Sequence, residues 1–179
     1  MKLSTVLASV ALAFGSAMAL VSTANADTYV TPLVGYQFQT SDTKGKQEAS
    51  LGEFQKNHAT YGVRLTQSVG DQNQVGLQYT QVDSNLDSYS VGLVGTTALT
   101  QTLYAVGGAG YNKLDGTVKS QEGAYVSAGL GAQLPLTNML TVKTEIGTNF
   151  LVNSSQWVPT ALVGLQFNIG QLTKPYSAK

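Results

Sequence analysis

Apolar side chains alternate with polar or small ones along most of the chain after residue 26, and this period constrains the fold more than any other feature. In the segment 29–39 the even positions carry Val, Pro, Val, Tyr and Phe, whereas the odd positions carry Tyr, Thr, Leu, Gly and Gln. Successive side chains of a β-strand point to opposite faces, so a period of two predicts strands. We predict eight strands, at 29–39, 59–67, 74–82, 88–96, 102–112, 124–134, 139–150 and 157–169.

The predicted strands are long, and their connections alternate between short and longer segments. A tilted strand of roughly nine to eleven residues can cross a bilayer, whereas strands of soluble proteins are usually shorter. The short connections lie at 68–73, 97–101 and 135–138, and the others lie at 41–58, 83–87, 113–123 and 151–156. This pattern predicts an all-β, eight-stranded antiparallel up-and-down transmembrane β-barrel with its termini on the side of the short turns.

The placement of charge indicates which face of the sheet meets which solvent. Only 11% of the residues are charged, compared with about 25% in an average soluble domain. Most of them fall in predicted loops, and only Arg64, Lys143 and Glu145 lie within predicted strands. A soluble protein could not expose an uncharged apolar belt of this size without aggregating. We therefore expect the apolar face to meet lipid and the glycines and small polar residues to fill a narrow lumen.

The first 26 residues have the features of a secretory signal peptide. Lys2 precedes an uncharged apolar stretch from Val6 to Val21, and Ala24-Asn25-Ala26 matches the small-x-small cleavage site. We predict a signal peptide at 1–26, a barrel at 27–170 and a short C-terminal tail at 171–179. An exported chain that crosses a bilayer with strands is expected in the bacterial outer membrane.

Aromatic residues on the predicted lipid face gather near the longer connections. Aromatic rings favour the boundary between acyl chains and head groups, so these residues predict an interfacial girdle. The girdle consists of Tyr36, Phe38, Tyr61, Tyr79, Tyr89, Tyr111, Phe150 and Trp157.

The charged residues within the strands all have the parity of the lumen face. Because an isolated buried charge costs several kcal/mol, we predict an ion-pair cluster in which Arg64 and Lys143 flank Glu145. The glutamines expected nearby are Gln37, Gln78, Gln133 and Gln166. Such a cluster would form a static polar filling of the lumen.

Composition argues against several other classes of function. Lys plus Arg and Asp plus Glu both number 10, so no basic surplus is left to bind nucleic acid. With one histidine and no cysteine, the chain predicts no metal site and no cofactor. His58, with Asp83 and Ser84 in the next predicted outer loop, could act as a general base toward a hydroxyl. Asp and Ser are also ordinary turn residues, and a non-enzymatic role is favoured.

Three segments resemble the small eight-stranded outer-membrane β-barrel family, which includes the transmembrane domain of outer-membrane protein A, outer-membrane protein X and the opacity-type surface proteins. These segments are the Ala-x-Ala export site, Tyr104 to Tyr111, and Ala161 to Gln171. In the last segment Gly164, Phe167 and Ile169 resemble the terminal signal that the barrel-assembly machinery recognises, with Ile169 where the family usually has Phe.

The resemblance implies a non-enzymatic monomer surrounded by outer-membrane lipid and lipopolysaccharide. It implies a structural or adhesin-like surface role, with a surface ligand bound through the loops 41–58 and 113–123. A narrow gated pore and a lipid A-modifying enzyme are the alternatives, because enzymes of this architecture exist among lipid A palmitoyltransferases and deacylases.

Overall fold

The computed structural model describes residues 27–39, 56–82, 88–114, 121–153 and 155–170. Among these residues there is no helix of the length and apolar character that a membrane span requires. The strands are β1 (Thr28–Gln39), β2 (Lys56–Val69), β3 (Asn73–Val82), β4 (Tyr89–Ala98), β5 (Leu103–Leu114), β6 (Gln121–Pro135), β7 (Leu140–Leu151) and β8 (Gln156–Asn168).

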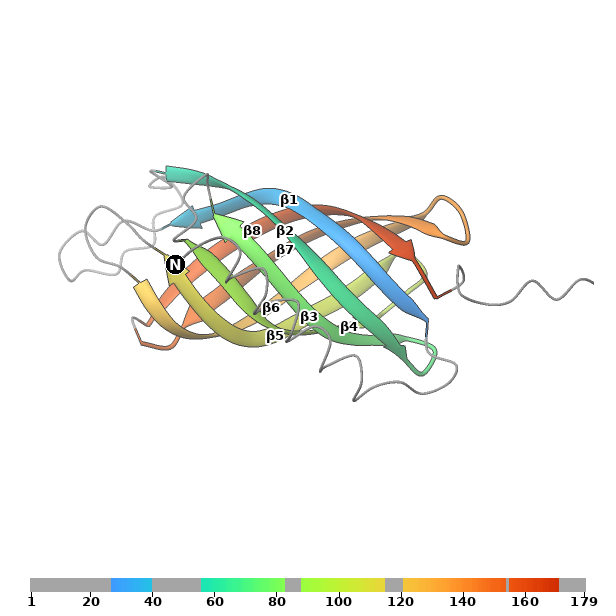
Figure 1. Cartoon of the computed structure of the whole chain (residues 1–179), viewed down its shortest axis with the longest axis horizontal. Helices are drawn as coiled ribbons and strands as arrows, with labels where there is room; N and C mark the ends of the chain where they lie inside the picture. Colours follow the sequence, from blue (N-terminus) through green and yellow to red (C-terminus); the bar gives the residue numbers. More distant parts are fainter. Residues whose placement is uncertain (1–26, 40–55, 83–87, 115–120, 154, 171–179) are drawn as a thin grey trace, which may run out of the picture.

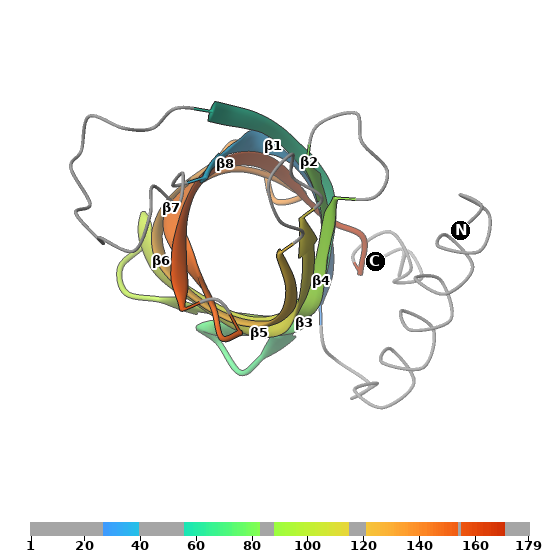
Figure 2. The same cartoon turned by 90° about the vertical axis from the view of Figure 1, so that its left-hand side faces the viewer.

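The eight strands form a closed antiparallel barrel in sequence order, as Figures 1 and 2 show. Each strand pairs with the next, and β1 pairs with β8, so that the barrel has no open edge. The backbone N–H of Ile169 donates to the carbonyl of Thr28 at 2.8 Å, which brings the two ends of the barrel sequence together. The predicted fold class and the eight predicted strands are confirmed.

The tight turns 70–72, 99–102 and 136–139 share the end of the barrel at which β1 starts and β8 finishes, called the inner end below. The opposite end, where β1 finishes and β2 starts, is called the outer end. Several strands reach farther toward the outer end than the sequence predicts. β2 starts at Lys56, and β5 and β6 remain paired up to Leu114 and Gln121.

The predicted loops 41–58 and 113–123 are therefore partly strand. The backbone hydrogen bonds between antiparallel strands do not require apolar side chains. The strands therefore extend beyond the segments in which apolar residues alternate. The rest of these loops lies outside the described residues, as do the predicted signal peptide 1–26 and the predicted tail 171–179.

The outer surface of the barrel is apolar. Leu93 and Ile146 are 66% and 69% exposed there. No described part of the protein covers this outer face of the barrel. Large apolar side chains in this state are typical of a surface that contacts lipid.

Two tyrosines point into the barrel and lie against glycines. A Cβ atom added at Gly131 of β6 would come within 2.3 Å of the ring of Tyr104, and one added at Gly92 of β4 would come within 2.6 Å of the hydroxyl of Tyr125. Because glycine has no side chain, the tyrosine rings can lie directly against the backbone of these strands. Both side chains are buried in the interior, at 2% exposure for Tyr104 and 6% for Tyr125.

The lumen contains apolar as well as polar side chains. Tyr125, Leu151 and Val158 form a buried apolar cluster near the outer ends of β6, β7 and β8. Leu151 faces inward because it lies an even number of residues from Glu145, whose inward position fixes the parity of β7. This cluster lies beside buried polar side chains in the outer part of the lumen, among them Gln37, Ser90 and Asn112.

Candidate functional site in the barrel lumen

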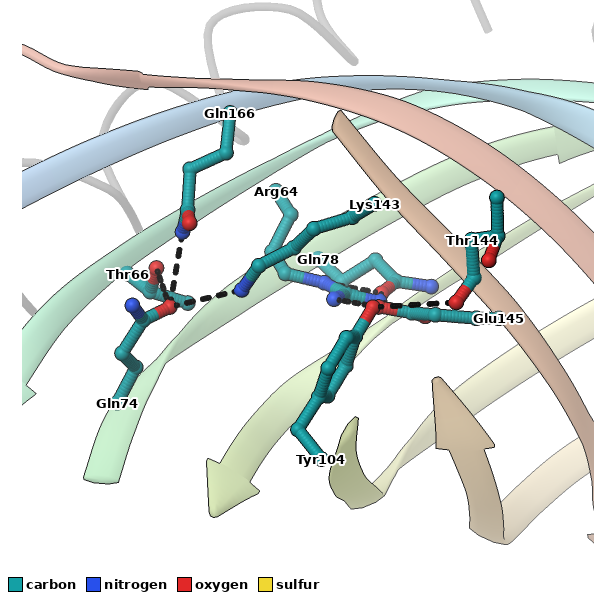
Figure 3. A network of polar contacts seen from close by, with 9 residues as sticks. All are labelled: Arg64, Thr66, Gln74, Gln78, Tyr104, Lys143, Thr144, Glu145 and Gln166. Atoms are coloured by element: carbon teal, nitrogen blue, oxygen red, sulfur yellow. Dashed lines mark hydrogen bonds and ion pairs between the residues drawn. The ribbon is translucent and has the colours of Figure 1, made fainter. Parts of the chain in front are cut away.

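A buried ion pair joins opposite parts of the barrel at mid-height (Figure 3). Arg64 of β2 donates from Nη1 to Oε1 of Glu145 at 2.5 Å and from Nη2 to Oε2 at 2.6 Å. The two side chains are 3% and 7% exposed. This is the bidentate arrangement that matches the planar guanidinium to a carboxylate. β2 and β7 are not neighbours in the sheet, so the pair bridges the lumen.

Neighbouring side chains complete the hydrogen bonding of this pair. Oε1 of Gln78 accepts from Nε and Nη2 of Arg64 at 2.8 and 2.6 Å. The hydroxyl of Tyr104 donates to Oε1 of Glu145 at 2.7 Å. Buried polar networks rigidify a core when their members are satisfied, and these contacts meet that condition for both charges.

Lys143 lies beside the pair rather than within it. Its Nζ donates to Oε1 of Gln74 at 3.4 Å, and the same oxygen accepts from Gln166 at 2.9 Å. Nζ also lies 4.7 Å from the ring centroid of Tyr104, a cation–π distance. Within the described strands Lys143 forms no ion pair. Of the predicted trio, the structure joins Arg64 to Glu145 and places Lys143 toward the inner end.

Of the four glutamines expected near the charges, the structure places only two in their network. Gln78 and Gln166 belong to the network, as Figure 3 shows. Gln133 instead donates to the carbonyl of Gln101 at an inner turn, at 3.3 Å. Gln37 is buried near the outer end of β1, where its amide nitrogen has no partner among the described residues.

Tyr104 and Gln74 belong to the network and were not predicted from the sequence. A signal for Tyr104 exists, because Tyr104 and Tyr111 are separated by an odd number of residues and cannot share a face of one strand. If Tyr111 belongs to the lipid-facing girdle, Tyr104 must point inward. Gln74 lies on the same face of β3 as Gln78, and the sequence has no other feature that indicates its place in the network.

A cavity of about 50 Å³ lies between the ion pair and Tyr125. Its wall includes hydroxyl groups of Thr80, Ser90, Ser127 and Thr160. It has room for about three or four water molecules, whereas pockets for small-molecule ligands usually enclose about 300–1,000 Å³. The site as a whole can hold water and fixed charges, and no group of three or more potential metal ligands gathers among the described residues.

The residues of the predicted girdle alternate with inward residues on their strands and lie toward the outer end. Trp157 and Tyr36 are each 54% exposed. Phe150 and Trp157 lie side by side on β7 and β8, with ring centroids 4.8 Å apart, a distance favourable for an aromatic pair. The hydroxyl of Tyr111 donates to the carboxylate of Glu122 on the neighbouring strand.

The residues of the predicted assembly signal lie around the inner half of β8. Gly164 faces inward, where an added Cβ would come within 2.8 Å of Leu33, and Phe167 faces outward. Ile169 follows the end of the strand. Of the residues weighed for catalysis, Asp83 and Ser84 lie outside the described residues, and only the backbone of His58 is described.

No protein-family model matches the chain. Outer membrane protein Omp38 of Acinetobacter baumannii is 31% identical over 204 aligned positions, which cover 94% of this chain and 56% of Omp38. The chain thus spans little more than half the length of this curated relative.

Solved structures with the same fold include two bacterial outer-membrane barrels. Neisserial surface protein A has a TM-score of 0.58 at 15% identity, covering 80% of this chain and 99% of that chain. The N-terminal β-barrel domain of Pseudomonas aeruginosa OprF has a TM-score of 0.52 at 13% identity, covering 78% and 97%. The sequence similarity to the outer membrane protein Omp38, together with the closed barrel, confirms the predicted location in the bacterial outer membrane. The chain has the fold of the small eight-stranded outer-membrane β-barrels, and its sequence is similar to that of Omp38.

Proposed function

We propose that this outer-membrane protein is a non-enzymatic, closed scaffold with a structural or adhesin-like role at the cell surface. The observation that carries the proposal is the bidentate pair of Arg64 and Glu145 across a lumen filled with buried side chains. A barrel occupied in this way offers its partners only its lipid face and its two ends. Surface ligands would then be recognised by the loops 41–58 and 113–123.

The partners of such a scaffold follow from its surfaces. The apolar outer face is suited to outer-membrane lipid, and the girdle residues would lie among the head groups of phospholipid and lipopolysaccharide. The last strand, with Gly164, Phe167 and Ile169, would be the segment that the barrel-assembly machinery recognises. Each barrel is closed on itself, which suits a monomer.

Shortening each loop in turn tests the surface role. Residues 42–54 or 115–120 would be replaced by a short Gly-Ser linker, and heat-dependent gel mobility would show whether each variant still assembles. Adherence to epithelial cells and resistance to detergent would be measured in a strain that lacks the protein and is complemented by each form.

For an adhesin, a shortened loop lowers adherence several-fold while detergent resistance is preserved. For a structural protein, only complete loss of the chain lowers detergent resistance. If neither adherence nor detergent resistance differs between the complemented strain and the strain without the protein, the proposal is wrong. A change in the lipid A mass spectrum that depends on His58 would overturn the non-enzymatic part.

A further inference from the structure

The outward-facing side chains at the outer ends of β2 to β6 form one continuous row. Tyr61 pairs with Gln81, Gln81 with Tyr89, Tyr89 with Lys113, and Lys113 with Glu122. Each lies an odd number of residues from a buried, inward residue of its own strand, so all five face outward. Side chains directly opposite each other on paired strands have Cβ atoms about 4.5–5.5 Å apart. These five residues are therefore near neighbours, and they are called the polar row below.

The polar row lies where the apolar belt of the barrel ends. The parallel row four residues nearer the inner end consists only of apolar side chains, namely Leu65, Leu77, Leu93, Ala109 and Val126. The lipid face of a membrane barrel is apolar up to the level at which the head groups begin, and its short turns lie on the periplasmic side. The polar row is thus at the level of the head groups of the outer leaflet.

Lys113 is the member of the row whose charge has no partner within the described part of the barrel. Glu122 lies directly opposite, but its carboxylate accepts a hydrogen bond from Tyr111 and forms no ion pair with Lys113. Among the described residues the ammonium group of Lys113 has neither a hydrogen bond nor an ion pair. An ammonium group at head-group level can bind a phosphate through a charge-assisted hydrogen bond.

The other side chains of the row are suited to a sugar. The hydroxyls of Tyr61 and Tyr89 can donate and accept hydrogen bonds, and the carboxylate of Glu122 accepts them. The row crosses four strand spacings of about 4.8 Å each, roughly 19 Å in all. This width exceeds the head group of one phospholipid, whereas a phosphorylated disaccharide matches both the width and the mixture of groups.

The outer rim on the other side of the barrel has a different chemistry. Phe150 of β7 pairs with Trp157 of β8, and their ring centroids are 4.8 Å apart. Such rings favour the boundary between acyl chains and head groups. They carry no charge, so they offer a phosphate no cation.

From this asymmetry we infer that the polar row binds the phosphorylated sugar head group of lipopolysaccharide, with Lys113 on a phosphate and the hydroxyls of Tyr61 and Tyr89 on the sugar. The inference rests on the proposed position of the girdle among the head groups. It goes further because it assigns one lipid to one side of the barrel.

Binding of defined lipids to the purified, folded barrel in detergent tests the inference. Native mass spectrometry would give dissociation constants for lipid A, for the same lipid A with both phosphates removed, and for phosphatidylglycerol. The main variant is Lys113→Gln, which removes the charge and keeps most of the length, and Lys113→Arg is the conservative variant. As a matched control, Lys113→Gln is combined with Gln72→Lys, which returns the charge at an exposed turn of the inner end. Only preparations that show heat-dependent gel mobility are measured.

We expect Lys113→Gln to weaken the binding of lipid A about fivefold, the effect of one basic residue at a lipid surface. Lys113→Arg should preserve the binding, and Gln72→Lys should not restore it. Dephosphorylated lipid A should bind the original chain and Lys113→Gln equally, because the lysine then has no phosphate to contact.

Equal affinity of the original chain and Lys113→Gln for lipid A would overturn the inference, and so would restoration by Gln72→Lys. An equal loss for phosphatidylglycerol would also overturn it, since the row would then bind any anionic lipid.

The sugar contacts are tested separately with Tyr61→Phe combined with Tyr89→Phe. This variant should weaken the binding of both forms of lipid A to the same extent, because the hydroxyls contact the sugar and not the phosphate. Unchanged affinities would overturn this part of the inference. Failure of these binding tests is distinct from failure of the proposed surface role, which is measured by the adherence and detergent resistance of whole cells.

Discussion

Glu145 accepts hydrogen bonds from both Arg64 and Tyr104 in the lumen. Replacing it with alanine would leave Arg64 and Lys143 as two buried cations without a carboxylate. Because removal of one partner leaves a buried charge uncompensated, Glu145→Ala should lower the free energy of unfolding by about 3–5 kcal/mol. Urea unfolding in lipid vesicles measures this value. Glu122→Ala, on the exposed side of β6, serves as the control and should change stability little.

The hydroxyl of Tyr104 donates a hydrogen bond to Glu145, and its ring forms a cation–π contact with Lys143. Tyr104→Phe removes only the hydroxyl, so the ring contact with Lys143 and the packing on Gly131 persist. A hydrogen bond to a charged group contributes about 1.5–3 kcal/mol, and the same unfolding measurement should show a loss in this range. Tyr111→Phe is the matched control, since that hydroxyl bonds a carboxylate on the exposed face. Equal losses in the two variants would contradict the assignment.

At the level of the strands, some positions require glycine because a neighbouring side chain packs directly against the backbone. A Cβ atom at Gly131 of β6 would lie 2.3 Å from Cζ of Tyr104, whereas one at Gly107 of β5 would have its nearest neighbour at 3.4 Å. Gly131→Ala should therefore cost about 1–3 kcal/mol through overpacking, and Gly107→Ala should be tolerated. Combining Gly131→Ala with Tyr104→Ala tests the cause, because the cost of the alanine should then largely disappear.

The girdle can be tested with one fluorophore, because Trp157 on β8 is the single tryptophan of the chain. Its side chain is 54% exposed on the outer face near the outer end. In vesicles, lipids brominated close to the glycerol backbone should quench its emission more strongly than lipids brominated near the end of the acyl chain. Absence of quenching by any of these lipids would place Trp157 away from the membrane and remove it from the girdle.

The whole molecule is a closed ladder in which every strand has two neighbours. Opening such a barrel in a membrane or detergent exposes backbone groups that have no alternative partner, so the barrel resists unfolding by SDS at room temperature. The folded and boiled forms should therefore migrate differently in an SDS gel of the outer-membrane fraction. A single band at one position under both conditions, with the protein recovered in the soluble periplasm, would contradict the orientation of the two faces.

The alternation of side chains was sufficient to determine the strands and their number, and the placement of charge indicated the face that meets lipid. β1 and β8 match their predicted segments to within a residue at each end. Arg64, Lys143 and Glu145 could be assigned to the lumen because a charge facing acyl chains is far more costly than one facing a polar interior. These results depend only on local periodicity and on the free energy of transfer of single side chains.

The pairing inside the lumen was decided by the tertiary structure. On β5, alanine and glycine carry little hydrophobic signal, and the sequence indicated the outward face only through Tyr111. Arg64 and Glu145 lie 81 residues apart on strands that are not neighbours. Which side chains meet across the lumen depends on the tilt and stagger with which the barrel closes. That stagger is a property of all eight strands together, and no single segment of the sequence contains it.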